Sequence, residues 1–154
     1  MNYYSDISVE DKTAIANGLI KLLADSYLLY LKTQNYHRNV TAPLFDVMRQ
    51  MIEEQNTELA HVVDEITDRI WELGMPVPDS HQVYQTLSSI GETVSIPPEV
   101  EMINQLIHDH EIMIRSTGTV LTHTHVVNDA ITAMLLTQNL RLHRKHMRAL
   151  RALL

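Results

Sequence analysis

Apolar residues recur every three or four positions along four long stretches of the chain, which is the spacing of a helix with one buried face. The first stretch runs from Ser8 to about His37, and Ser8 with Asp11 resembles a capping box at its start. The second runs from about Pro43 to Leu73, and Gly74, followed by two prolines, ends it as a left-handed cap does. Its expected core positions are Leu44, Val47, Met48, Met51, Gln55, Leu59, Val62, Ile66 and Ile70.

The second half of the chain carries two further helices after a long connection from Met75 to Pro98. We expect a short helix inside that connection, from Ser80 to Ile90. Ser95 and the Pro97-Pro98 pair open the third long helix, which lasts to about His125, and Asn128 or Asp129 caps the fourth. The pattern predicts an all-α fold, a ferritin-like four-helix bundle with a short extra helix between helices two and three. We expect residues 1–154 to form one such domain.

Composition narrows the class of protein further. The formal net charge is −7, and the first eight residues contain no lysine or arginine, which weighs against general phosphate binding. The chain has no cysteine, which excludes disulfides and thiolate metal sites and fits a reducing cytoplasm. We also expect no membrane span and no signal peptide, because no uninterrupted apolar run is long enough and no charged leader precedes one.

Four charged residues of the second helix form what we call the polar stripe: Arg49, Glu53, Asp64 and Asp68. Glu53 and Asp64 lie about 16 Å apart along one helix axis, so one subunit cannot bring both to one ion. A second, antiparallel copy crossing near Glu58 and Leu59 would place Glu53 beside Asp64 of the partner subunit. The stripe therefore predicts half of a site that a two-fold axis completes.

Several sequence motifs then resemble the Dps family (DNA-binding proteins from starved cells). The most specific is Tyr-Leu-Leu-Tyr-Leu-Lys-Thr-Gln-Asn-Tyr-His at 27–37, which is similar to the family's first-helix signature. Supporting motifs follow in the family's order: Val63–Ile66, Arg69-Ile70, Leu73-Gly74 and Leu135–Gln138. The resemblance implies a dodecameric cage that oxidises iron(II), usually with hydrogen peroxide, at a site between two subunits, and that stores the ferric mineral.

Matching the family's motif to this chain assigns the iron ligands His37 and Glu53 from one subunit and Asp64 and Asp68 from its partner. Arg49 stands where the family has a second histidine, and arginine has no lone pair to donate to a metal.

The family pattern also differs from this chain outside the ligand set. Arg38 and Arg148 replace the family's tryptophans, and Met134 replaces an acidic residue near the expected three-fold pore. We expect Asp129 to line part of that route instead.

Three functions compete for this set of residues. The first is a cage with ferroxidase activity. The second is a cage of the same architecture with weak or lost activity, in which Arg49 clamps Asp68 of the partner subunit as an internal counter-ion. The third is chromosome compaction through the basic end of helix four, which the acidic balance disfavours.

The remaining histidines, methionines and acids have simpler interpretations. His108, His110, His123, His125, His143 and His146 are expected at the surface, although His143 and His146 are three apart and could share a metal. Met48, Met51, Met102 and Met113 are expected in the core. The series Glu54, Glu58, Glu65 and Glu72 is typical of a solvated face, with mineral nucleation as the alternative. Trp71 is expected at a subunit contact.

Overall fold

The computed structural model describes residues 7–41, 45–91 and 95–154. Its helices are α1 (Val9–Asn39), α2 (Phe45–Glu72), α3 (His81–Leu87), α4 (Glu99–Val126) and α5 (Ala130–Arg151). No strand occurs in the described part of the chain. The all-α prediction and the short extra helix are confirmed, and each helix lies within a few residues of its predicted range.

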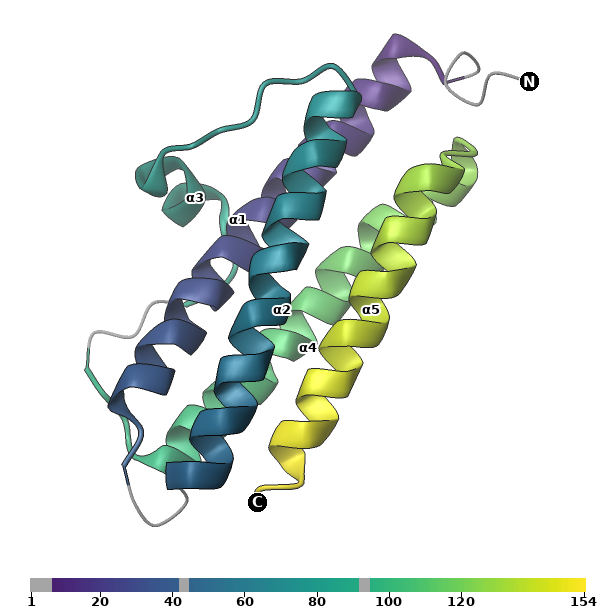
Figure 1. The fold of residues 1–154 in the computed structure, drawn as a ribbon. Helices are drawn as coiled ribbons and strands as arrows, with labels where there is room; N and C mark the ends of the chain where they lie inside the picture. Colours follow the sequence, from purple (N-terminus) through teal and green to yellow (C-terminus); the bar gives the residue numbers. More distant parts are fainter. Residues whose placement is uncertain (1–6, 42–44, 92–94) are drawn as a thin grey trace.

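The long helices form two antiparallel pairs, α1 with α2 and α4 with α5 (Figure 1). The connection between α2 and α4 runs back along the length of the bundle, so these two helices point in the same direction (Figure 1). This is the up–down arrangement with one long crossover that ferritin-like bundles use.

Local signals in the sequence explain where the helices begin and end. The Ser8 side chain accepts a hydrogen bond of 3.1 Å from the Asp11 backbone nitrogen, which satisfies one donor at the start of α1. Gly74, two residues after the end of α2, has φ +85°, a conformation that glycine adopts without steric cost. Asp129, the second of the two candidates, caps α5 through a 3.1 Å bond from the Thr132 nitrogen. Pro43 and Leu44 lie outside the described residues.

The core lies between the four long helices and contains the predicted apolar positions of α2, apart from Val47. Val47 is 61% exposed, so its assignment to the core of the subunit was wrong. Met48, Met102 and Met113 are fully buried as predicted. The amide of Gln55 is buried, and its nitrogen donates to the His146 carbonyl oxygen across 3.3 Å, which pairs one of the two polar atoms at this core position.

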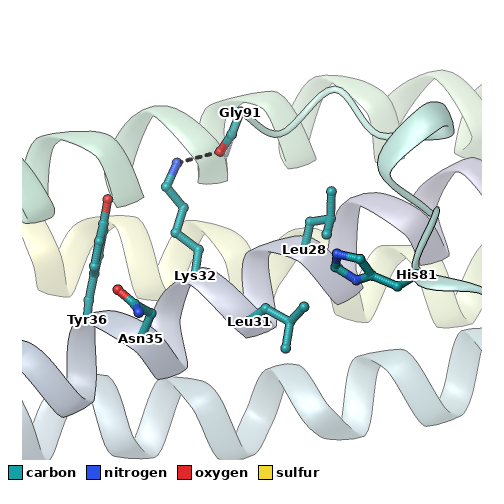
Figure 2. A pocket seen from close by; sticks show the side chains of 7 residues that line it. All are labelled: Leu28, Leu31, Lys32, Asn35, Tyr36, His81 and Gly91. Carbon is teal, nitrogen blue, oxygen red and sulfur yellow. Dashed lines mark hydrogen bonds between the residues drawn. The ribbon is translucent and has the colours of Figure 1, made fainter. Parts of the chain in front are cut away.

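Side chains of α1 hold the crossover against the bundle. The buried Asp25 carboxylate accepts hydrogen bonds from the Ser88 hydroxyl at 2.8 Å and the Ser89 backbone nitrogen at 2.6 Å. Lys32 lines a hollow of about 260 Å³ and donates to the Gly91 carbonyl oxygen across 3.0 Å (Figure 2). Lys32 also forms a 2.8 Å ion pair with the buried Asp109 of α4. Burial raises the pKa of Asp109, and the opposing effect of Lys32 is smaller, so the net pKa is raised.

By length and composition alone, α1 is long and apolar enough to cross a membrane, a test that the core helix of a bundle also passes. However, 56% of its most apolar window is buried inside the bundle. This burial is what a core helix of a helical bundle requires.

Candidate functional site

The polar stripe of α2 lies on the outer surface of the bundle. Arg49, Glu53, Asp64 and Asp68 are all exposed in the single subunit. In the described part of this subunit, no three histidine or acidic side chains are arranged, as they stand, to hold a metal ion. The stripe is therefore accessible to a second copy of α2, and its role as half of a shared site stays a prediction.

The structure brings His37 and Glu53 together, one from the end of α1 and the other from the third turn of α2. Their Nε2 and Oε2 atoms are 3.9 Å apart. The His37 Nε2 atom is buried and has no hydrogen-bond partner among the described residues, while the Glu53 side chain is 70% exposed. An imidazole nitrogen and a carboxylate aimed at the same side of the subunit are ligand types that iron(II) accepts.

The partner half of the predicted site lies further along the same helix. Asp64 is eleven residues from Glu53, or about 16 Å along the axis, and Asp68 is one turn beyond it. Arg49 is one turn before Glu53 and at the same surface. Because the polar stripe is exposed along this length, a second copy of α2 can pack against it in the antiparallel arrangement predicted from the sequence.

The largest correction concerns three histidines that were expected at the surface. His110 of α4 and His143 and His146 of α5 are all buried in the bundle interior. A signal for this existed in the helical spacing, because His110 continues the core positions Ile103, Leu106 and Met113.

Burial lowers the pKa values of these three histidines. Burial lowers the pKa of His143 to about 3, aided by His146. Burial lowers the pKa of His146 to about 4, although the neighbouring Glu58 opposes the shift. His110 shifts in the same direction for the same reason, so the pKa of all three is below the usual histidine range.

Glu58 differs from the other acids of its series, which were predicted to form a solvated face. Its carboxylate lies 3.0 and 3.3 Å from Lys145 Nζ and 3.5 Å from His146 Nε2. Burial raises the pKa of Glu58, but the hydrogen bonds and charges of Lys145 and His146 outweigh it, so the net pKa is lowered. Glu54, Glu65 and Glu72 are exposed as predicted.

Asp129 does not line a surface route, contrary to the prediction. Asp129 is 2% exposed and forms a 2.9 Å ion pair with Arg69. The Arg69 Nε atom also donates a hydrogen bond to the Thr132 hydroxyl across 2.8 Å. This network joins the end of α2 to the start of α5. Met134 lies instead in an open hollow of about 330 Å³ whose acidic residues come from α2: Glu65, Asp68 and Glu72.

Comparisons with known proteins identify the family to which this chain belongs. The ferritin-like domain family matches residues 16–154. The low temperature-induced protein all0458 of Nostoc sp. is 34% identical over 108 residues, which are 70% of this chain and 60% of that protein. The chain therefore matches less than two thirds of that relative's length.

Two further comparisons concern Dps proteins. The DNA protection during starvation protein 2 of Bacillus anthracis is 32% identical over 96 residues, which are 62% of this chain and 66% of that protein. The crystal structure of the Dps protein of Vibrio cholerae O1 superposes with a TM-score of 0.91 at 24% identity, covering 95% of this chain and 92% of that one. Dps proteins are among its relatives and structural neighbours, and the chain belongs to the ferritin-like domain family.

Proposed function

We propose that this protein is a Dps-like cage in the cytoplasm that oxidises iron(II) at a two-fold interface and stores the product, which protects the cell from oxidative damage. The observation that carries the proposal is the His37–Glu53 pair, an imidazole nitrogen without a hydrogen-bond partner 3.9 Å from an exposed carboxylate. The Vibrio cholerae neighbour, described as one of the ferritin-like diiron-carboxylate proteins, supports iron as the substrate.

In this proposal, Asp64 and Asp68 of the partner subunit complete the ligand set around iron. The antiparallel copy of α2 brings them to His37 and Glu53, in a cage that we expect to have twelve subunits. Three carboxylates neutralise much of the positive charge of the bound iron, and the imidazole supplies a nitrogen ligand. Asp68 is one methylene shorter than the glutamate usual in the family, so its carboxylate reaches less far.

The reaction balances with peroxide as the electron acceptor. Two iron(II) ions each give up one electron, the O–O bond of one hydrogen peroxide breaks, and two water molecules are consumed. The products are two FeO(OH) units and four protons. The carboxylates hold the iron while an open coordination position admits the oxidant.

The decisive experiment adds iron(II) anaerobically to Glu53→Gln, to Glu54→Gln and to the unsubstituted protein, followed by peroxide. Glu54 is the matched control because it is an exposed acid next in sequence, on a different side of α2. We expect the initial rate of Fe(III) absorbance growth to fall at least about tenfold in Glu53→Gln alone, since loss of even an outer partner of a metal ligand costs that much. Equal rates in all three proteins, or no bound iron in the unsubstituted protein, would refute the proposal.

Arg49→His tests how far Arg49 limits this activity. The substitution removes a fixed positive charge next to the predicted site and supplies a ligand nitrogen. We expect a faster oxidation rate and tighter iron(II) binding. If the rate and affinity do not change, Arg49 does not restrict the site.

A further inference from the structure

The interior of the bundle contains a cluster of potential ligands that the proposed function does not use. His110 comes from α4, His143 and His146 come from α5, and Glu58 reaches them from α2. The three imidazoles are buried, and Glu58 is 33% exposed at the edge of the cluster. We call these four residues the bundle cluster.

Hydrogen bonding satisfies this cluster only in part. The Nδ1 atoms of His110 and His143 are 3.0 Å apart, so one ring donates its proton to the other. The Nε2 atoms of both rings and the Nδ1 atom of His146 are buried without a hydrogen-bond partner in the described part of the chain, whereas His146 Nε2 faces the Glu58 carboxylate at 3.5 Å. Buried polar groups are normally paired, so three such nitrogens in one cluster show that its capacity to bind is not used up.

The spacing of the rings suits a metal ion. An imidazole that binds an ion at about 2.1 Å has its ring centre about 3.2 Å from that ion, and two such rings at a tetrahedral angle have centres about 5.2 Å apart. The ring centroids of His110 and His143 are 5.2 Å apart, and those of His110 and His146 are 5.3 Å apart. Two nitrogens bound at about 2.1 Å to one tetrahedral ion are about 3.4 Å apart, so the two Nδ1 atoms, now 3.0 Å apart, must separate by about 0.4 Å as an ion replaces the hydrogen bond between them.

We propose that His110, His143, His146 and Glu58 form a site for a divalent transition metal inside each subunit, separate from the interface site. Imidazole-rich sites select zinc, iron(II) or cobalt(II) over magnesium and calcium, which prefer oxygen ligands. As the side chains stand, no three of them converge on one point, so a rotation of the His146 ring must complete the site. The carboxylate of Glu58, 3.5 Å from His146 Nε2, then provides the fourth ligand.

The protein provides both ligands in the right protonation state and a route to the site. The lowered pKa values of the three histidines keep them neutral, as metal ligands must be, at any pH near neutrality. Glu58 also lines an open hollow of about 500 Å³ with Glu53 and Glu54, whose charges attract cations. Lys145, which holds Glu58 at present, is 68% exposed and is free to turn into solvent when a cation takes its place.

Cobalt(II) is the probe, because its visible absorption reports nitrogen and oxygen ligands directly. The titration uses untagged protein carrying Glu53→Gln, Asp64→Asn and Asp68→Asn, which removes the three carboxylate ligands of the predicted interface site and leaves only His37 there. We expect one cobalt(II) per subunit with a visible band. Adding His143→Leu, which keeps a buried side chain of similar volume, abolishes that band. Circular dichroism confirms that each variant is helical.

A second pair of variants decides the question if His143→Leu does not fold. Glu58 and Glu54 line the same hollow on α2, so Glu58→Gln and Glu54→Gln form a matched pair. We expect cobalt(II) to bind at least about tenfold more weakly in Glu58→Gln and within twofold of the parent in Glu54→Gln. Less than one tenth of a cobalt(II) per folded subunit in the parent, or equal binding in both variants, overturns the proposal. The bundle cluster is then a hydrogen-bonded core element only.

Discussion

The ion pair between Arg69 and Asp129 joins the end of α2 to the start of α5, and its removal offers a quantitative test of the fold. The two side chains are 4% and 2% exposed, and their atoms approach to 2.9 Å. Arg69→Met keeps most of the apolar stem and removes the charge, which leaves the Asp129 carboxylate buried with hydrogen bonds from Thr132 alone among the described residues. Breaking a buried pair in this way costs about 3–5 kcal/mol.

This loss is large enough to measure by thermal unfolding. For a chain of this size, each kcal/mol lowers Tm by about 2–4 °C, so Arg69→Met should unfold about 6–20 °C earlier. Differential scanning calorimetry at equal subunit concentrations gives the comparison, with Arg144→Met, an exposed arginine of α5, as the control. Because Asp129→Asn removes the stranded charge and still caps α5, the double variant should recover part of the loss. Equal Tm values for Arg69→Met and Arg144→Met would refute this reasoning.

Three further predictions follow from the bundle and its crossover. The first concerns protein from which metal has been removed with a chelator. In the folded chain the pKa of His143 is lowered to about 3 and that of His146 to about 4, whereas in the unfolded chain both have the usual value of 6.5. Between pH 6.5 and these lowered values, the unfolded chain therefore binds more protons than the folded chain. Stability is therefore fully present above pH 6.5 and is lost as the pH falls, by up to about 1.4 kcal/mol per pH unit for each histidine. Urea unfolding from pH 7 to 4.5 should show this slope, and His143→Leu should flatten it. Gly74→Ala should cost about 1–2 kcal/mol, measured by the urea midpoint, because φ +85° is strained for alanine. Asp25→Ala should cost about 1–3 kcal/mol and speed amide exchange at Ser89, whose nitrogen loses its acceptor; unchanged exchange there would contradict the proposed anchoring.

The histidines illustrate where reading one helix at a time fails. His143 and His146 were expected at the surface because histidine is more often exposed than fully buried, and α5 by itself has several polar faces. Their burial depends on which face α4 and α2 cover, and this in turn depends on the packing of the whole bundle. The opposite error occurred at Val47, where an apolar residue at helical spacing lies at the surface of the subunit.

Asp129 shows the same limit for a charged residue. Its role as a helix cap was predictable, because asparagine and aspartate before a helical stretch accept from the first turn. Its ion pair with Arg69 was not, because sixty residues separate the two and only the docking of α2 against α5 brings them to 2.9 Å.

The sequence by itself determined the number, order and approximate limits of the helices, the long crossover, the left-handed end of α2 at Gly74, and the spacing that keeps Glu53 from Asp64 within one chain. These follow from local rules, since periodicity, capping and backbone preference act over a few residues. Only the tertiary structure decided the 3.9 Å distance between His37 and Glu53, which the family resemblance had assigned to one site. It alone decided that Asp129 is buried against Arg69 and that three histidines from two helices meet inside the bundle near Glu58. Such contacts join residues that are distant in sequence, and they depend on how whole helix faces pack together.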